Sequence, residues 1–336
     1  MHALVTGGAG FIGSHLCGEL LEHGHKVTVL DDLSTGSVAN ISHLKSNSRF
    51  RYVIDSVMNR PLLAELVDDS DVVFHLAAAV GVRLIVESPV RTLHTNVRAT
   101  ELVLDAATKK KKKVILASTS EVYGKRERVP FREDDDLVIG PPLCGRWSYA
   151  CSKALDEFLA IANHRERGLP TVIVRLFNTV GPRQSGRYGM VLPRFINQAL
   201  AGEAISIYGN GQQSRCFGWV GDVVHALTEL ADLDSAIGQV FNIGSDEEIT
   251  INELAEIVKS VTRSDSPVFH ISYEEAYGKE FEDMQRRVPD LQRIREAIGF
   301  TTSKSIYEIV QAVAEDLGCR RQEQAEIVPE LALAPQ

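Results

Sequence analysis

The stretch TGGAGFIG, residues 6–13, decides the fold. It follows the apolar run Ala3–Thr6 and precedes the helical pattern SHLCGELLEHG, so its glycines fit G-x-G-x-x-G in the strand–turn–helix context that this motif requires. A side chain at Gly10 would keep a pyrophosphate away from the helix N-terminus, where unpaired N–H groups hold anions, and Gly13 lets the helix pack closely on the strand. The stretch therefore predicts a dinucleotide site that includes Gly7, Gly10, Phe11, Ile12 and Gly13.

An acidic residue closes the second predicted strand. Asp31 lies eighteen residues after Gly13, where a carboxylate can accept hydrogen bonds from both hydroxyls of a ribose. The same carboxylate would repel a 2′-phosphate, so the pattern favours NAD over NADP. Asp32 follows directly and is included in the predicted cofactor site.

The first half of the chain alternates short β-branched runs with helical patterns. Such alternation predicts βαβ units, and apolar runs without clean alternation are typical of parallel strands that are buried on both faces. We therefore expect an α/β fold, a Rossmann-type doubly wound parallel sheet with a smaller mixed α/β C-terminal lobe. The predicted strands are Ala3–Thr6, Lys26–Leu30, Tyr52–Ile54, Val72–His75, Val114–Ala117 and Thr171–Arg175.

The remaining chain is expected to divide between the two lobes. Residues 1–177 form the cofactor domain, with a return segment at about 218–244, and residues 178–217 and 245–320 form the substrate lobe. Thr250-Ile-Asn-Glu253 has capping-box spacing and predicts a helix start, and a last helix carries Ile306, Ile309, Val310, Val313 and Leu317 on one face. Residues 321–336 hold two prolines and no periodicity, which predicts a flexible tail.

Composition excludes several classes of protein. The chain has 336 residues and a net charge of −9, which argues against a nucleic-acid partner, and no run approaches the roughly 18 apolar residues of a membrane helix. Five scattered cysteines without CxxC spacing, together with scattered histidines, predict neither a disulfide framework nor a metal site. The start MHALVTGG lacks the pattern of a signal peptide, so we expect a cytoplasmic protein. The lysine run 109–113 is expected to be a solvated turn.

Two segments carry candidate catalytic residues. Tyr149 and Lys153 lie four residues apart in RWSYACSKALDEF, which puts both side chains on one face of a helix. The pKa of a free tyrosine is about 10, and a neighbouring ammonium group favours the phenolate, so the pair suits a general base. One βα unit earlier, Thr119 at a strand end is placed to donate a hydrogen bond to a substrate oxygen. Glu121 is either a second ionisable group of the site or a solvated loop carboxylate.

These motifs in combination resemble the extended branch of the short-chain dehydrogenases/reductases, and within it the nucleotide-sugar epimerases, dehydratases and decarboxylases. The resemblance covers residues 1 to about 318 and rests on TGGAGFIG, HLAA at 75–78, STSEVYG at 118–124, YACSK at 149–153 and RLFNTVGPR at 175–183. It implies a homodimer paired through helices near 92–107 and 149–164, and a UDP-linked sugar as substrate. It also implies that Lys153 holds the nicotinamide ribose and that Asp55, Ser56, Ala77, Ala78 and Asn96 lie at the cofactor.

The resemblance assigns further residues to the substrate. It implies that Asn178 contacts the diphosphate, that Tyr208 and Arg215 contact the nucleoside, and that Arg287 binds the phosphates or the sugar, with Arg183 also at the substrate. Arginine guanidinium groups suit phosphate oxygens, but Arg194 and Arg215, taken singly, are either substrate ligands or members of surface salt bridges. The segment AAAVGVRLIVESP at 77–89 departs from the Ser-Pro-x-x-Tyr-like segment of the decarboxylases. Within it, Arg83 either holds a substrate carboxylate or is a surface arginine.

Relatives of this kind begin alike: the tyrosine removes the C4 hydroxyl proton and the C4 hydride passes to NAD+. If C6 is a carboxylate, the 4-keto sugar is a β-keto acid that loses CO2; if C6 is CH2OH, hydride return on the other face gives a 4-epimer. Ser120 stands where dTDP-glucose dehydratases carry Asp, and simple 4-epimerases usually lack a residue like Glu121. We therefore expect decarboxylation of UDP-glucuronate to UDP-xylose. The alternative is a UDP-hexose or UDP-uronate 4-epimerase, and a 4,6-dehydratase or a non-catalytic NAD(H) sensor ranks below these two functions.

Overall fold

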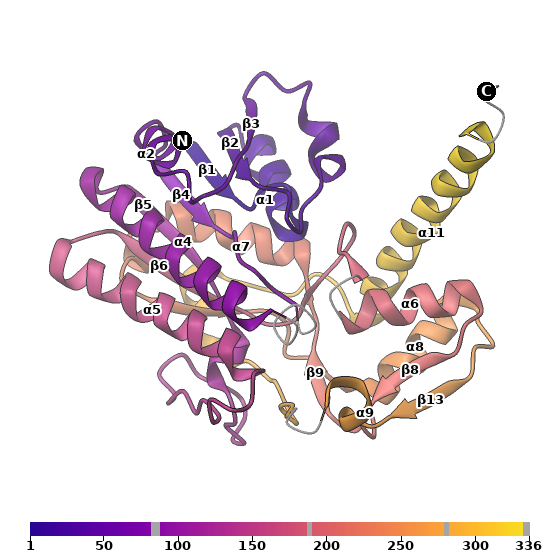
Figure 1. Cartoon of the computed structure of the whole chain (residues 1–336). Helices are drawn as coiled ribbons and strands as arrows, with labels where there is room; N and C mark the ends of the chain where they lie inside the picture. Colours follow the sequence, from indigo (N-terminus) through magenta and orange to yellow (C-terminus); the bar gives the residue numbers. More distant parts are fainter. Residues whose placement is uncertain (82–87, 187–189, 279–281, 332–336) are drawn as a thin grey trace.

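Seven parallel strands form one sheet in the order β11-β6-β5-β4-β1-β2-β3 (Figure 1). The computed structural model describes residues 1–81, 88–186, 190–278 and 282–331, with side chains to residue 321 except that of Tyr277. All six predicted strands are present, which confirms the doubly wound Rossmann-type sheet. The strands are β1 His2–Thr6, β2 Lys26–Asp31, β3 Phe50–Ile54, β4 Val72–His75, β5 Lys113–Thr119, β6 Thr171–Leu176 and β11 Val240–Ile243.

Helices cover both faces of this sheet. Successive residues of a strand point to opposite faces, so Ala3 and Val5 of β1 pack in one apolar cluster and Leu4 packs in another. The first cluster is closed by α1 (Phe11–Glu22) and α7 (Val220–Asp232). The second cluster is closed by α2 Arg60–Asp68, α4 Pro89–Lys110 and α5 Trp147–Arg167.

The direction of strand succession reverses between β1 and β4. Strand β1 lies between β2 and β4, and Thr6 at its end is in register with His75 at the end of β4. Ligands of open α/β sheets bind outside the carboxyl ends of the strands at such a reversal. The glycine turn after Thr6 and the alanine segment after His75 therefore face one crevice.

A second lobe packs below the carboxyl edge of the sheet (Figure 1). The helices α6 (Val191–Ala201) and α8 (Ile251–Thr262) share an apolar cluster with the first turns of α11 (Ile306–Leu331). The capping box predicted at Thr250 is present, because its hydroxyl accepts from the Glu253 N–H and the Glu253 carboxylate accepts from the Thr250 N–H. The other elements are β7 Thr179–Val180, β8 Ile205–Tyr208, β9 Ser214–Cys216, β10 Gly218–Trp219, β12 Glu248–Thr250, β13 Val268–Ile271, α9 Tyr273–Tyr277, α10 Gln292–Ile298, η1 Val38–Leu44, η2 Ser120–Tyr123 and η4 Asp234–Ala236.

The chain end differs from the expectation. Helix α11 runs on to Leu331 and projects from the second lobe, where we expected an irregular tail from residue 321 (Figure 1). Arg, Gln, Glu and Ala dominate the sequence RRQEQAE at 320–326, and these residue types have high helix propensity even where no apolar stripe marks a buried face. Propensity therefore extends this helix past the last periodic apolar residue.

The lysine run is more than a solvated turn. Lys111 adopts the left-handed conformation that ends α4, and the lysines before it are exposed. Lys112 Nζ donates to the carbonyls of Asp68 and Ser70 at the end of α2, and Lys113 Nζ donates to two carbonyls at the end of α7. A cation at a helix C-terminus is stabilising because it meets carbonyls that lack intrahelical partners. The last two lysines therefore cap the helices on either side of β5.

Candidate active site

The glycine turn after β1 leaves no room for side chains. A Cβ on Gly13 would lie 2.2 Å from the Gly7 carbonyl oxygen, and a Cβ on Gly10 would lie 3.0 Å from the same atom. Gly7 itself has φ of +74°, and a Cβ there would lie 2.8 Å from the Ala77 nitrogen. Helix α1 begins at Phe11, directly after this turn, so its first N–H groups face the crevice at the carboxyl edge of the sheet.

Asp31 braces this turn from the end of β2. One carboxylate oxygen accepts from the Ala9 N–H at 2.9 Å and the other accepts from the Leu33 N–H at 2.8 Å. Burial raises the pKa of Asp31, and the two backbone hydrogen bonds oppose that change. Asp32 is exposed and accepts from the Ser34 N–H. Asp31, the residue predicted to bind the ribose, is therefore hydrogen-bonded to the glycine turn and forms one structural unit with it.

The other predicted cofactor residues line the same edge of the sheet. Asp55 and Ser56 follow β3, and the Asp55 carboxylate accepts from the Ser56 N–H and from the side chain of Asn59. Ala77 and Ala78 follow β4. Asn96 is buried beneath them, bonded to both backbone groups of Ala79 and to the Ser152 hydroxyl, so its side chain supports the alanine segment.

Tyr149 and Thr119 meet where β5 ends and α5 begins. The Tyr149 side chain is buried, and Thr119 caps η2 by accepting from the Glu121 N–H at 3.3 Å. The pKa of the Tyr149 phenol is raised, first by burial and then by the charges of Glu121 and Asp156, while a hydrogen bond with Thr119 opposes the increase. The structure thus brings together the predicted tyrosine, threonine and glutamate.

Lys153 forms an ion pair that was not predicted from the sequence. Its ammonium donates to Asp156 Oδ2 at 2.8 Å, and both side chains are buried. The Asp156 carboxylate that pairs with Lys153 is among the charges that raise the pKa of Tyr149, and the lowering of this pKa by Lys153 stays a prediction. A spacing of three residues on one helix face was the available signal for the Lys153–Asp156 pair.

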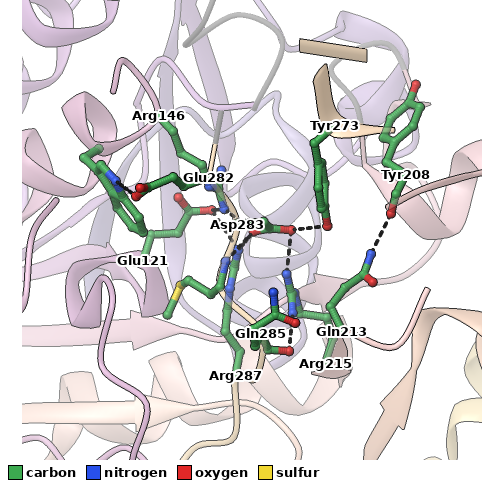
Figure 2. A network of polar contacts seen from close by, with 12 residues as sticks. Glu121, Arg146, Tyr208, Gln213, Arg215, Tyr273, Glu282, Asp283, Gln285 and Arg287 are labelled. Carbon is green, nitrogen blue, oxygen red and sulfur yellow. Dashed lines mark hydrogen bonds and ion pairs between the residues drawn. The ribbon is translucent and has the colours of Figure 1, made fainter. Parts of the chain in front are cut away.

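A cavity between the two lobes is lined by arginines. Figure 2 shows Arg146, Arg215 and Arg287 converging on one carboxylate, that of Asp283. Their guanidinium nitrogens lie 3.0, 2.8 and 3.7 Å from its oxygens. The lining also includes Glu121, Asn178, Thr179, Met190, Leu192, Arg194, Tyr208, Gln213, Phe217 and Tyr273.

Burial and neighbouring charges shift the pKa values of two residues in this cluster, Asp283 and Arg287. Burial acts to raise the pKa of Asp283, but Arg215, Arg146 and Arg287 together lower it to about 2. Burial lowers the pKa of Arg287 to about 10, with the neighbouring arginines acting in the same direction and Glu121 opposing them. The carboxylate of Asp283 therefore stays ionised and offsets positive charge that the cavity would otherwise carry unpaired.

Glu121 links this cluster to Tyr149. Its Oε1 lies 3.3 Å from both Arg146 and Arg287, so the two guanidinium groups share one carboxylate oxygen. Its Oε2 is buried and has no hydrogen-bond partner among the residues that the structure describes. The alternative that Glu121 is a solvated loop residue is wrong, because the glutamate is only 8 % exposed.

Two aromatic or amide residues predicted for the substrate also line the cavity. The guanidinium carbon of Arg194 lies 3.9 Å from the centroid of the Tyr208 ring, so one face of the tyrosine is covered by a cation. Asn178 donates to the Cys216 carbonyl and accepts from Arg287 at 3.4 Å. Both residues therefore belong to the arginine-lined cavity.

Arg183 lies elsewhere. Its side chain donates to the carbonyls of Ser14 and Asn40, and its backbone N–H donates to the carboxylate of Asp316. It thus ties α1 and η1 to α11 and is not among the residues that line the cavity. Arg83 lies outside the described residues.

Three residues of the site were not singled out from the sequence: Arg146, Tyr273 and Asp283. Arg146 precedes Tyr149 by three residues and Asp283 precedes Arg287 by four, so each lies close in sequence to a residue that was predicted. Their ion pairs join positions up to 137 residues apart, which no local pattern reveals. Within the described ranges, no group of three or more His, Cys, Asp or Glu residues is arranged to hold a metal ion.

The fold and the site together define a class of protein: a Rossmann-fold enzyme whose Tyr-x-x-x-Lys pair lies at the cofactor edge of the sheet, beside an arginine-lined cavity. A family model described as GDP-mannose 4,6 dehydratase matches residues 4–313. The chain belongs to this family of extended short-chain dehydrogenases/reductases, as its motifs predicted.

Individual relatives are similar over nearly the whole chain. A UDP-N-acetyl-alpha-D-glucosaminuronate decarboxylase of Bacillus cytotoxicus is 44% identical, with 88% of this chain and 91% of the relative covered. UDP-glucuronic acid decarboxylase 1 of Danio rerio is 38% identical over 88% of this chain and 68% of its own length. The structure of UDP-glucuronic acid 4-epimerase from Bacillus cereus with UDP-glucuronic acid and NAD has a TM-score of 0.85 at 28% identity, covering 95% and 99% of the two chains.

Proposed function

We propose that the chain is an NAD-dependent decarboxylase of a UDP-linked hexuronate, UDP-glucuronate or its 2-acetamido counterpart. The observation that carries this proposal is the buried cluster in which Arg146 and Arg287 share the carboxylate of Glu121 next to Tyr149. Guanidinium groups suited to carboxylates therefore lie beside the catalytic tyrosine, where a sugar with an anionic C6 group is expected. The two curated relatives described above are both uronate decarboxylases.

The residues of the first lobe fit the cofactor. The turn at Gly7, Gly10 and Gly13 provides space that any Cβ would fill, and helix α1 presents its N-terminus to the pyrophosphate. Asp31 disfavours a 2′-phosphate, and Lys153 keeps ammonium hydrogens beyond the one given to Asp156 for a ribose hydroxyl. Bound NAD supplies the hydride acceptor.

Tyr149 and Thr119 carry out the proton chemistry at C4. Tyr149 takes the proton of the C4 hydroxyl as hydride leaves C4, and Thr119 donates a hydrogen bond to the same oxygen. The resulting 4-keto sugar is a β-keto acid, so the C5–C6 bond breaks, CO2 departs, and the bonding electrons form an enolate between C5 and C4. Arg287 and Arg146 stabilise the negative charge, and Glu121 relays a proton from water to C5. Tyr149 then returns its own proton to the C4 oxygen as C4 takes up hydride again.

A proton NMR time course tests this function. With UDP-glucuronate or UDP-N-acetylglucosaminuronate and a catalytic amount of NAD, we expect a UDP-pentose spectrum to replace the hexuronate spectrum as CO2 is released. Tyr149→Phe, which keeps the ring and removes the phenol, should lower turnover by at least about a thousandfold, the size of a full general-base contribution. Conversion to a UDP-galacturonate spectrum with all carbons retained would instead make the chain a 4-epimerase.

The 4-epimerase remains the second candidate function for one reason. The Bacillus cereus epimerase structure shares the fold over 95% of this chain and is described with the same uronate and NAD. Replacing Glu121 with Gln separates the two functions, since an epimerase needs no proton at C5. In a decarboxylase the variant should lose formation of the UDP-pentose and retain C4 oxidation, which appears as bound NADH at 340 nm. In an epimerase the variant should keep converting the uronate to its C4 epimer.

We further propose a cytoplasmic homodimer paired through α4 and α5. These helices pack on each other and expose Val90, Leu93, Leu155 and Phe158. Four large apolar side chains on one helix pair are typical of an interface. Phe158→Glu should convert a dimer to a monomer by light scattering, whereas Tyr307→Glu, an exposed aromatic on α11, should not. All five cysteines are free, which suits a reducing compartment, and among the described helices none is long and apolar enough to cross a membrane.

A further inference from the structure

The ion pair between Lys153 and Asp156 lies behind the catalytic tyrosine. The two side chains are 3% and 0% exposed, and their charged atoms are 2.8 Å apart. In the described part of the chain, Asp156 is the only carboxylate in ion-pair contact with this lysine. A buried carboxylate without compensation costs several kcal/mol, so the pair is held together strongly.

The groups around the pair are neutral or point elsewhere. His75 of β4 is fully buried, and its ring bonds the hydroxyls of Thr6 at 2.7 Å and Thr100 at 3.3 Å. Burial, followed by the charge of Lys153, lowers the pKa of His75 to about 3, so this imidazole carries no charge at neutral pH. The next carboxylate on α5, that of Glu157, forms an ion pair with Arg175 at 2.7 Å. Within the described ranges, Asp156 is therefore the one carboxylate that balances the charge of Lys153.

The same carboxylate acts on Tyr149. Among the described residues, the charged groups that act on the phenol are Glu121 on η2, Arg287 from the 282–291 segment and Asp156 on its own helix, while Lys153 lies four residues along that helix. Burial raises the pKa of the phenol most, and the negative charges of Glu121 and Asp156 raise it further, against the positive charge of Arg287. Without the cofactor, the phenol stays protonated at neutral pH.

A redox-neutral reaction makes opposite demands on this phenol. In the proposed function, Tyr149 must take a proton from the C4 hydroxyl and later return it to the same oxygen. Bound NAD would add one positive charge to the site in its oxidised form and none in its reduced form. A base that responds to this change needs a pKa that the cofactor charge alone moves across neutrality.

We propose that Asp156 is a positioning residue that fixes the Lys153 ammonium and balances its charge, so that Tyr149 ionises with NAD+ bound and is an acid with NADH bound. An uncompensated lysine would favour the phenolate in both states. The enzyme would then oxidise the sugar but return the proton poorly. This inference rests on the proposed function for the two opposite roles of Tyr149 and not for the identity of the sugar.

Ultraviolet difference titration of the loaded enzyme tests the proposal without any sugar. The absorbance change near 295 nm of the wild type minus that of Tyr149→Phe reports ionisation of Tyr149, measured once with NAD+ and once with NADH. We expect a midpoint at least about one pH unit lower with NAD+, a shift typical of one nearby charge. Equal midpoints in the two states would overturn the proposal, whatever the enzyme's substrate, and this measurement needs no variant at Asp156.

Asp156→Asn then assigns the effect to this carboxylate. The variant is isosteric and should lower the Tyr149 midpoint by about one pH unit with either form of the cofactor. Glu157→Gln is the matched control, since it removes another buried charge one residue away that pairs with Arg175, and it should leave the midpoint unchanged. An unchanged midpoint in Asp156→Asn, or an equal shift in Glu157→Gln, would contradict the proposal.

Turnover gives an independent readout. With the sugar substrate, Asp156→Asn should keep KM and lower kcat about tenfold, with bound NADH accumulating at 340 nm because proton return has become slow. Asp156→Glu restores the charge and should restore most of kcat. A purely structural aspartate would instead change NAD retention or thermal stability without moving the phenol midpoint. If the titration behaves as expected but UDP-hexuronates are not converted, the substrate assignment fails and the role of Asp156 stands.

Discussion

The two halves of the active site are built from different materials. The cofactor half is a backbone turn in which added Cβ atoms at Gly7 and Gly13 would meet main-chain atoms within 3 Å. The substrate half is a set of long charged side chains, Arg146, Arg215, Arg287, Glu121 and Asp283, held by ion pairs of 2.8 to 3.7 Å. A backbone turn has one shape, whereas guanidinium groups can exchange a protein carboxylate for a substrate anion.

This difference has a consequence for binding. The cofactor half is preorganised, so little conformational entropy is lost when a dinucleotide enters. In the substrate half, Asp283 and Glu121 form ion pairs with the arginines. An incoming diphosphate or uronate must replace or share those ion pairs. We therefore expect substitutions in the cofactor half to act on folding and cofactor affinity together, and those in the substrate half to act on charge balance.

The largest effect is expected for Gly13→Ala. The new Cβ would lie 2.2 Å from the Gly7 carbonyl oxygen and 2.7 Å from the Gly8 Cα, and neither atom can move without opening the turn. We expect the free energy of unfolding to fall by more than about 3 kcal/mol, at the upper end for overpacking, and NAD affinity to fall over a hundredfold. Thermal unfolding and calorimetric titration with NAD measure the two quantities.

Gly18→Ala is the control, because it lies on the same helix and its Cβ would meet nothing within 4 Å. It should be neutral or stabilising by up to about 1 kcal/mol, since alanine is the better helix former. If Gly13→Ala leaves too little folded protein, Gly10→Ala, with a milder contact of 3.0 Å, should fold and still bind NAD more weakly. Wild-type NAD affinity in both variants would show that the turn is not the cofactor half.

The second effect is expected for Asp283→Asn in the arginine cluster. The substitution leaves Arg146, Arg215 and Arg287 in a buried site without their common carboxylate, which should cost about 3 kcal/mol by urea unfolding. Asp134→Asn is the control, because Asp134 pairs with Arg132 in solvent and such pairs contribute little. Equal stability of the two variants would contradict a cluster that depends on Asp283.

The pH dependence of this loss has a defined sign. The pKa of Asp283 in the folded protein is about 2, below the ordinary value near 4 that it regains on unfolding. Its stabilisation is therefore fully present above about pH 4 and declines as the pH falls toward 2. The difference in unfolding free energy between wild type and Asp283→Asn should shrink over that interval, and a constant difference down to pH 2 would argue against a lowered pKa.

The same contrast decides what the sequence can predict. The glycine turn, Asp31 and the Tyr149–Lys153 pair were all recognised, because each depends on spacing within one strand–turn–helix unit or one helix face. Asp283 was not recognised, because the three arginines that pair with it come from separate segments and meet only in the folded chain. Arg183 shows the converse: its motif is local, but its side chain turns to α1 and η1 rather than to the cavity.

The third effect concerns cofactor choice. Asp31→Asn retains an amide oxygen for one of the two backbone N–H groups of Ala9 and Leu33 and removes the charge that repels a 2′-phosphate. We expect NAD affinity to fall about tenfold, or roughly 1.4 kcal/mol, while NADP affinity rises. Asp32→Asn, at an exposed neighbour, should change neither affinity. Calorimetric titration with both cofactors would contradict this role of Asp31 if the preference ratio stayed the same.

The smallest effect is expected for Tyr208, which gives the substrate half an aromatic surface rather than a charge. Arg194 covers the Tyr208 ring at 3.9 Å, so the ring is held in place for a flat nucleotide base. Tyr208→Phe keeps the ring and should hold UDP affinity within about twofold, whereas Tyr208→Ala should lose about 1 kcal/mol, close to fivefold. Tyr307→Ala, exposed on α11, should have no effect on UDP binding. Equal losses in the Phe and Ala variants would mean that the hydroxyl binds the nucleotide, and the substrate half would then be polar throughout.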